Sequence, residues 1–243
     1  MKLVIWDFDG TLGYRDGGAW TATLLDVLQR ELPSHHVTFE ELRPFMASGF
    51  RWQMTEQAHT PVDSADPRTA DAWWGELEPL FVQAYRSVGV RDAEARRLAR
   101  CFRSTYLNPL RWRRFDDVLP TLEALIERGW THVILSNHVP ELPELVEAVG
   151  LAPYFVRIFN SAEIGYEKPH PAPFKVVQAA FPDVEAWWMV GDSYAADVLG
   201  AEAVGIPAVL VRGSHPEARF CLPDLCGLPG LLAEWSPVMG GSD

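Results

Sequence analysis

The sequence contains only three cysteines, Cys101, Cys221 and Cys226, and none of them forms a Cys-x-x-Cys pair. This composition argues against a disulfide framework or a cysteine zinc site and favours free thiols in a reducing compartment. The sequence also lacks a long apolar run. The first such run, 3–6, is interrupted by an aspartate and is too short for a signal peptide, and no stretch approaches a membrane span. We therefore expect a cytoplasmic protein with no membrane partner.

Positive charge is also scarce, because 21 Lys and Arg residues face 33 Asp and Glu residues, which gives a formal net charge of −12. Binding to nucleic acid or to anionic membranes needs clustered basic charge, so we expect neither partner. An anionic small molecule is still compatible, because the local field of a site can differ from that of the whole surface. With 243 residues and 48% hydrophobic residues, the chain can form one large domain, or one domain that carries an insertion.

The second half of the sequence alternates short β-branched runs with amphipathic segments that end at glycine or proline. Strands separated by helices predict right-handed βαβ units and therefore an α/β fold, a doubly wound parallel-sheet Rossmann-like core. The expected strands are 3–6, 132–135, 156–159, 187–190 and 208–211, and the expected helices are 117–128, 141–149, 171–181 and 194–203. The tail after Arg212, rich in proline and glycine, is expected to be irregular.

About 100 residues separate the first strand from the next unit of the sheet, and their apolar spacing is helical. Helices are expected over 19–31, 67–88 and 92–106, and a capping box at Thr38-Phe39-Glu40-Glu41 predicts the start of another. We interpret this stretch as an inserted all-helical cap domain. The predicted division is a core of residues 1–13 and 116–243 with a cap of residues 14–115.

Polar residues follow three of the expected strands, at the edge of the sheet where ligands bind in such folds. Asp7 and Asp9 follow the first strand, and Asp192 and Asp197 follow the strand at 187–190. Carboxylates brought together repel one another, and a divalent cation removes that repulsion. A few oxygen ligands with water remaining are what Mg²⁺ prefers, so the four aspartates predict a magnesium site.

Groups that can bind a phosphate accompany these acids. Ser136 and Asn137 follow the strand at 132–135, Thr11 offers a hydroxyl and an amide, and Lys168 lies in a loop that is stiffened by prolines. An ammonium group there can neutralise a phosphate and a nucleophilic carboxylate together.

The ordered set Asp-x-Asp-Gly-Thr (residues 7–11), Ser-Asn (136–137), Lys-Pro (168–169) and Gly-Asp with a further Asp (191–197) resembles the haloacid dehalogenase-like (HAD) hydrolase superfamily. The insertion after the first motif resembles the helical C1-type cap of the phosphoglycolate-phosphatase-like branch. The motif resemblance covers roughly residues 3–13 and 116–211.

This resemblance implies a role for each matching residue. Asp7 would attack phosphorus and form an aspartyl-phosphate, and Asp9 would protonate the leaving alkoxide and then deprotonate water. Ser136 and Lys168 would bind the transferring phosphoryl group. Mg²⁺ would be held by the ligand set Asp7 (side chain), Asp9 (backbone carbonyl) and Asp192, with Asp197 in support.

The expected function is therefore a Mg²⁺-dependent phosphatase of a small phosphorylated metabolite. Dehalogenases of the superfamily need no acid for the leaving group and lack an aspartate at position 9, so Asp9 favours phosphate chemistry. A phosphomutase of the β-phosphoglucomutase type is the nearest alternative, because it uses the same core residues. A non-catalytic phospholigand-binding protein is a further alternative, which the complete set of catalytic residues disfavours.

Substrate selection is assigned to the cap. There Arg51 is expected to contact an anionic group of the substrate and Trp52 to cover the leaving group. His138 and the other histidines show no metal-ligand spacing. The oligomeric state is left open between a monomer and a homodimer.

Overall fold

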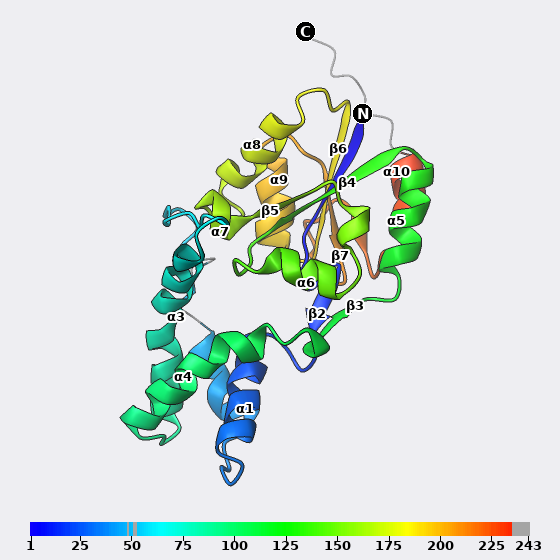
Figure 1. Ribbon diagram of the computed structural model, residues 1–243. Coiled ribbons are helices and arrows are strands. Elements are labelled where there is room, and N and C mark those ends of the chain that lie inside the picture. Colours follow the sequence, from blue (N-terminus) through cyan, green and yellow to red (C-terminus); the bar gives the residue numbers. More distant parts are fainter. Residues whose placement is uncertain (48, 51–52, 235–243) are drawn as a thin grey trace.

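The computed structural model describes residues 1–47, 49–50 and 53–234. One part is built on a six-stranded sheet in the order β5-β4-β1-β6-β7-β8, with parallel pairing between all neighbours. The strands are β1 (Lys2–Trp6), β4 (Trp130–Ser136), β5 (Arg157–Asn160), β6 (Ala186–Gly191), β7 (Ala208–Val211) and β8 (Cys221–Leu222). Figure 1 shows helices on both faces of this sheet. The predicted doubly wound α/β core is confirmed.

The two faces of the sheet carry separate apolar clusters because side chains alternate along each strand. In β1, Leu3 and Ile5 face one cluster while Val4 and Trp6 face the other, and all four are fully buried. The helices of this part are α5 (Val118–Glu127), α6 (Leu142–Ala148), α7 (Ser161–Ile164), α8 (Pro171–Ala180), α9 (Gly200–Glu202) and α10 (Leu228–Glu234). A π-helical turn, η5 (Tyr194–Leu199), precedes α9.

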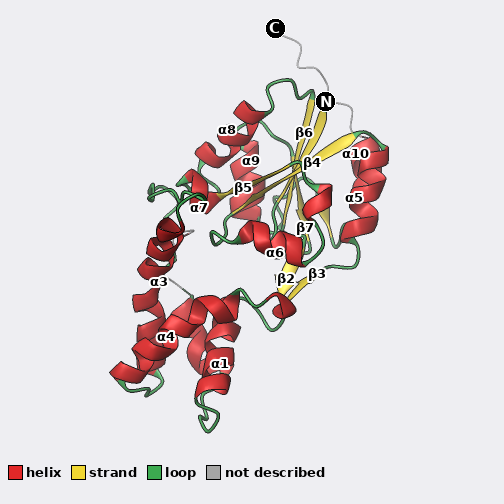
Figure 2. Ribbon diagram, viewed as in Figure 1, coloured by secondary structure: helices red, strands yellow, loops and turns green. Residues whose placement is uncertain are grey.

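A second group of helices lies away from the sheet, as Figure 2 shows in red. It consists of α1 (Trp20–Glu31), α2 (Phe39–Leu42), α3 (Pro67–Ser87) and α4 (Asp92–Tyr106). The predicted capping box at the start of α2 is present, with Thr38 and Glu41 satisfying each other's backbone amides. The core of this bundle is aromatic, and the rings of Phe81 and Phe102 stack 3.8 Å apart.

Two findings were not predicted from the sequence. Strands β2 (Gly13–Arg15) and β3 (Trp112–Arg114) form an antiparallel ribbon at the two ends of the helical insertion. The tail after Arg212, expected to be irregular, contains β8 and α10, because Leu228 and Leu232 bury their side chains against the sheet cluster. The division into core and cap at residues 13/14 and 115/116 stays a prediction, and both boundaries fall on or beside the ribbon.

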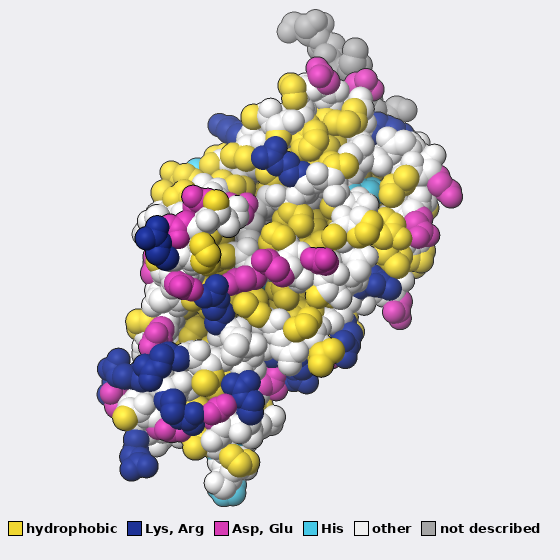
Figure 3. All heavy atoms as spheres, viewed as in Figure 1, with side chains coloured by type: hydrophobic (Ala, Val, Ile, Leu, Met, Phe, Trp, Pro, Cys, Tyr) yellow, Lys and Arg dark blue, Asp and Glu magenta, His cyan; other side chains and the backbone are white. Residues whose placement is uncertain are grey.

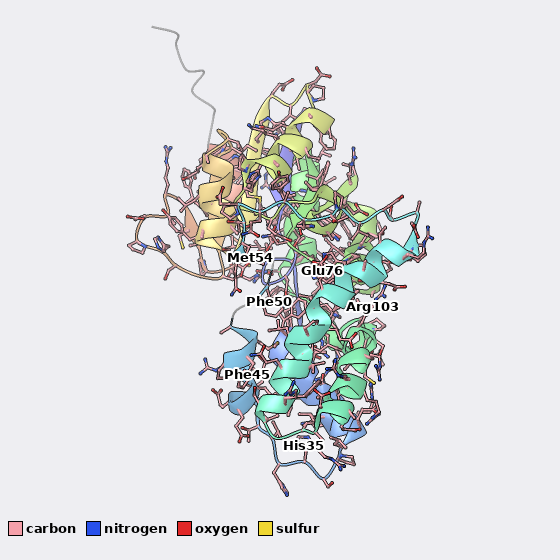
Figure 4. The ribbon with its side chains drawn as sticks, turned by 90° about the vertical axis from the view of Figure 1, so that its left-hand side faces the viewer. His35, Phe45, Phe50, Met54, Glu76 and Arg103 are labelled. Atoms are coloured by element: carbon pink, nitrogen blue, oxygen red, sulfur yellow. The ribbon has the colours of Figure 1, made fainter. Side chains whose placement is uncertain are left out.

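Besides the ribbon, hydrogen bonds join the insertion to the sheet-bearing part. Glu141, just before α6, accepts hydrogen bonds from Trp74 of α3 and Arg103 of α4. The backbone of residues 59–62 donates to the carbonyls of Gly165 and Ala162. In Figure 4, Phe50, Met54 and Arg103 lie near the junction of the two parts, whereas His35 lies at the far end of the bundle.

Charge on the bundle is mixed. On the face shown in Figure 3, Lys and Arg side chains gather over the helical part, interspersed with Asp and Glu. Within α4, Arg96 pairs with Asp92 at 2.9 Å and Arg97 pairs with Glu94 at 2.6 Å. Arg96 and Arg97 are therefore paired with acids of their own helix. Within the described ranges, no helix combines the length and the apolar character that crossing a bilayer requires.

Candidate active site

The carboxyl ends of β1, β4 and β6 bring the predicted polar residues to one edge of the sheet. They line a pocket of about 440 Å³ between the sheet and the helical insertion. Of the predicted site residues, those in the pocket wall are Asp7, Asp9, Ser136, Asn137, Lys168, Asp192 and Asp197. Residues that are up to 190 positions apart in sequence therefore share one cavity, as the topology requires.

Asp7 lies at the centre of the hydrogen-bond network. Its backbone amide continues the strand pairing by donating to Val190, which fixes the residue one position beyond β1. Oδ1 of Asp7 accepts from the Ser136 hydroxyl at 2.7 Å and from Lys168 Nζ at 2.9 Å. Because the residue is only 8% exposed, its carboxylate depends on these donors for solvation.

Lys168 joins two of the acids. Its Nζ also donates to Asp197 Oδ1 at 2.6 Å, and the residue is 2% exposed. Burial alone would lower the pKa of Lys168, but the charges of Asp197 and Asp7 outweigh it and raise the pKa above its ordinary value. Lys168 is therefore a permanent cation in the pocket.

Asn137 holds the Lys168 loop by two hydrogen bonds. Its amide nitrogen donates to the Lys168 carbonyl at 2.8 Å, and its amide oxygen accepts from the Lys168 backbone amide at 2.7 Å. The side chain predicted to bind substrate is thus engaged with the loop that carries the cation.

Three carboxylates form a compact group, because Asp7, Asp192 and Asp197 each offer an oxygen within 4.8 Å of the others. Burial raises the pKa of both Asp192 and Asp197, and the charge of Asp7 adds to the shift, although Lys168 opposes it. Such crowding is unfavourable without a cation, and a set of carboxylate oxygens suits a hard divalent ion. The residues present therefore fit a site for a divalent cation.

The three carboxylates of this group differ in how many of their oxygens are left to bind a cation. Both oxygens of Asp197 already accept hydrogen bonds, one from Lys168 and the other from the Ser193 amide at 3.0 Å. Asp192 is exposed at the pocket, and its Oδ1 accepts a hydrogen bond from the Thr11 hydroxyl at 3.2 Å. Asp7 and Asp192 are therefore the better placed of the three to meet a cation.

Asp9 lies in the pocket wall but not in this group of three. Burial, together with the charge of Asp7, raises the pKa of Asp9 to about 7, against the effect of a hydrogen bond from the Gly10 backbone. A carboxyl group with this pKa can hold and release a proton near neutral pH.

Two glycines allow the carboxylates to approach the backbone. Gly10 has φ +87°, and a Cβ there would collide with the Asp192 carboxylate. A Cβ at Gly191 would collide with the Asp197 carboxylate in the same way. Neither position can carry a side chain without displacing an acid of the site.

Two predicted substrate residues are not in the described pocket wall. Thr11 is fully buried, and its hydroxyl and amide are bonded to Asp192 and to the Phe8 carbonyl. Thr11 therefore supports Asp192 instead of facing the cavity. Arg51, with Trp52, lies outside the described residues, so its predicted contact stays a prediction.

Among the wall residues that were not predicted as site residues are Trp20, Met46, Tyr106 and His138. The first three come from the insertion and have no sequence signal beyond helical apolar spacing. His138 directly follows Ser136-Asn137 at the end of a strand, and this position could have marked it. Burial lowers the pKa of His138 to about 4, although Asp7 and the nearby Val139 backbone oppose the shift.

The parallel sheet, the carboxylate group and the buried lysine define a Rossmann-like enzyme with a site for an anionic substrate. A family model described as haloacid dehalogenase-like hydrolase matches residues 1–205. The chain therefore belongs to the haloacid dehalogenase-like hydrolase family, as its motifs predicted.

Individual relatives agree with this assignment. A mouse protein called haloacid dehalogenase-like hydrolase domain-containing protein 3 is 28% identical over 222 residues, which cover 89% of this chain and 84% of that protein. A phosphoserine phosphatase of Thermus thermophilus is 37% identical over 164 residues, 63% of this chain, and the match spans less than two thirds (62%) of that protein. The crystal structure of a 2-haloacid dehalogenase from Pseudomonas syringae pv. Tomato superimposes with a TM-score of 0.62 at 25% identity and covers 97% and 100% of the two chains.

Proposed function

We propose that the protein is a Mg²⁺-dependent phosphatase that hydrolyses a small phosphorylated metabolite through an aspartyl-phosphate on Asp7. The observation that carries this proposal is the Asp7 carboxylate, held by Ser136 at 2.7 Å and Lys168 at 2.9 Å inside the pocket. A nucleophile, a cation and a hydroxyl donor at one point are the components that phosphoryl transfer requires, because its catalysis is mostly positioning and charge stabilisation. Phosphatase names among the relatives support the same reaction class.

In the first step, a carboxylate oxygen of Asp7 forms a bond to phosphorus while the bond from phosphorus to the substrate's alcohol oxygen breaks. Lys168 lowers the repulsion between the anionic nucleophile and the anionic phosphate, and Ser136 donates to the phosphoryl group or to the nucleophile. Asp9 gives its proton to the leaving alkoxide, a role that suits a carboxyl whose pKa is raised to about 7.

In the second step, water attacks phosphorus and the bond to Asp7 breaks, which releases phosphate and restores the carboxylate. Asp9, now ionised, takes the proton of the attacking water. Asn137 keeps Lys168 in place through both steps, because it bonds the backbone of that residue on both sides.

Asp7 and Asp192 would hold the Mg²⁺, with the backbone carbonyl of Asp9 as the third protein ligand. When bound, the cation neutralises the crowded carboxylates and stabilises negative charge on the phosphoryl oxygens. Asp197, whose oxygens are engaged by Lys168 and Ser193, would act by orienting the lysine. Thr11 would position Asp192 through its hydroxyl.

A dehalogenase reaction is the competing possibility within the family, since several similar structures carry that name. Displacement of a halide needs no proton, so Asp9 would have no task in it. We therefore favour the phosphatase. A cytoplasmic location, a monomeric or homodimeric state and contact of Arg51 with the substrate stay predictions.

The test is release of inorganic phosphate from p-nitrophenyl phosphate and from a panel of phosphorylated metabolites, with Mg²⁺ and with a chelator. Asp7→Asn should lower turnover by more than about a thousandfold, whereas Asp183→Asn, on an exposed surface turn, should not. Halide release from 2-haloacids without phosphate release would refute the proposal. Rapid isomerisation of a sugar phosphate with slow hydrolysis would instead identify a mutase.

A further inference from the structure

His138 is a buried side chain in the pocket wall with no role in the proposed chemistry. The residue is 4% exposed, and its backbone amide is fixed by the Ser161 hydroxyl at 3.2 Å. Its ring is surrounded by aromatic groups, with centroids 5.6 Å from both Phe8 and Trp112 and 6.3 Å from Tyr106. Burial among these rings favours the neutral imidazole, because a charged one would lose its hydration.

No well-formed hydrogen bond to a ring nitrogen of His138 is present among the described residues, although the Val139 backbone lies close to the ring. A buried polar atom without a partner costs free energy, and most such atoms in folded proteins are satisfied. The second histidine buried against the sheet illustrates the difference. Both nitrogens of His132 are engaged, one by Trp6 and the other by the Leu122 carbonyl. Both nitrogens are buried, but His138 itself lines the cavity that receives the ligand, so the ligand is the nearest source of a partner for them.

The remaining wall of the pocket shows which ligand groups fit. Trp20, Met46 and Tyr106 of the insertion contribute apolar and aromatic surface. Among the described wall residues, Lys168 is the one permanent cation, and its ammonium is already bonded to Asp7 and Asp197. Four carboxylates share the same wall. Among these described wall residues, a second negative charge on the substrate would therefore find no cation that is not already paired.

We propose that His138 recognises a hydroxyl group of the substrate's alcohol portion, and that the substrates are phosphate monoesters of uncharged polyhydroxylated alcohols, such as polyols or sugars. This inference rests on the proposed phosphatase function and adds its substrate class. A neutral imidazole offers one donor and one acceptor, which matches a hydroxyl, a group that both donates and accepts. The rings of Trp20 and Tyr106 supply apolar faces against which the carbon skeleton of such an alcohol packs.

The first test compares kcat/KM of the wild-type protein on two groups of esters, with Mg²⁺ present. Glycerol 3-phosphate and ribose 5-phosphate represent uncharged polyhydroxylated alcohols, whereas 2-phosphoglycolate and O-phosphoserine carry a carboxylate. We expect the first group to be preferred by at least about tenfold, as one buried hydrogen bond allows. Preference for the carboxylated esters would overturn the inference while the phosphatase proposal stands. No phosphate release from any ester, including p-nitrophenyl phosphate, would overturn both.

The second test removes the ring nitrogens. His138→Leu should lower kcat/KM for the polyol and sugar phosphates, mainly by raising KM. The ratio of this kcat/KM to the kcat/KM for p-nitrophenyl phosphate should fall by about tenfold. His138→Gln, whose amide both donates and accepts, should recover part of the ratio. An equal loss on all esters would assign His138 a structural role and overturn its role in recognition.

His132→Leu is the matched control, because it makes the same change at a buried histidine outside the pocket wall. It should lower the free energy of unfolding without changing the ratio between the two groups of esters. A changed ratio in this control would show that the ratio reports on general packing and would also count against the inference. Thermal melts of all three variants establish that each is folded at the assay temperature.

Discussion

The ammonium of Lys168 lies 2.6 Å from Oδ1 of Asp197, and both side chains are almost fully buried. Asp197→Asn keeps an oxygen at this position but removes its charge, which leaves Lys168 with Asp7 as its remaining anionic partner. We expect the free energy of unfolding to fall by about 1–3 kcal/mol and kcat to fall more than KM rises, because the lysine loses its orientation. Urea unfolding and steady-state kinetics on p-nitrophenyl phosphate measure the two effects.

Asp183→Asn is the control for this change, since that residue is exposed and belongs to a surface turn. The orienting role of Asp197 would be refuted by a variant that keeps wild-type turnover and stability. A loss of stability alone, with unchanged kcat, would restrict Asp197 to a structural task.

Magnesium should stabilise the folded protein, because the cluster of Asp7, Asp192 and Asp197 is assembled only in the folded state. At a concentration one hundred times its dissociation constant, an ion that binds only the folded state adds about 2.7 kcal/mol. Asp192→Asn should abolish most of this gain, yet the metal-free variant should be at least as stable as the metal-free wild type, since one crowded charge is gone. Thermal unfolding with Mg²⁺ and with EDTA measures both.

A second acidic group provides the control for the metal experiment. Asp117, Asp224 and Cys226 also lie close together, but the Asp117 carboxylate is paired with Arg212 at 2.6 Å. Asp224→Asn should therefore leave the magnesium effect unchanged. A magnesium effect that disappears in this variant and persists in Asp192→Asn would move the metal site away from the pocket.

Glu141 should hold the insertion against the sheet-bearing part. Its carboxylate accepts from Trp74 Nε1 at 3.1 Å and from Arg103 Nε at 2.8 Å. Glu141→Ala leaves both donors without their acceptor, so we expect a loss of about 1–3 kcal/mol and faster amide exchange in α3 and α4. Hydrogen exchange followed by mass spectrometry detects this, with Glu147→Ala, at an exposed position of α6, as the control. Equal rates of amide exchange in α3 and α4 for the two variants would contradict the role of Glu141 in holding the insertion.

The histidine at position 132 should make stability depend on pH. Trp6 Nε1, which can only donate, gives its hydrogen to Nδ1 at 3.1 Å, so Nε2 carries the ring proton and faces the Leu122 carbonyl at 3.3 Å. This arrangement requires the neutral ring, and burial lowers the pKa of His132 to about 4. The unfolded chain has a pKa of about 6.5 and therefore binds the proton more readily.

This difference in pKa between the folded and unfolded states fixes the direction in which stability changes with pH. The contribution of His132 is fully present above about pH 6.5 and is lost as the pH falls towards about 4, to a total of about 3 kcal/mol. Urea unfolding at several pH values should show a steeper loss for the wild type than for His132→Leu. His36→Leu, at an exposed position, should keep the wild-type slope. Parallel pH profiles for all three would contradict the assignment.

The sequence predicted the sheet and the chemistry of its edge because both depend on local patterns. A β-branched run followed by a polar residue marks a buried strand and its end, and this was enough to find Asp7, Ser136 and Asp192. Helical apolar spacing, another local pattern, placed the helix that begins at Asp92 and ends at Tyr106, whose bounds agree with α4.

What the sequence did not reveal depends on contacts between distant segments. The pairing of Gly13 with Arg114 joins residues 101 positions apart, and three-residue strands carry no periodic signal of their own. The side chains of Thr11 and Asn137 were expected to face the substrate, yet each has a nearer partner inside the protein. Tyr106 enters the pocket through the packing of α4, which apolar spacing cannot distinguish from ordinary burial.

The ribbon of β2 and β3 has a consequence for how this architecture can diversify. The chain leaves the sheet-bearing part and returns to it through adjacent strands, so both chain connections of the helical insertion lie at a single seam (Figure 1). The acids and the lysine belong to segments on the other side of that seam, whereas Trp20 and Tyr106 belong to the attached part. One module can thus be exchanged or reshaped to accept a different alcohol while the reactive groups keep their mutual positions.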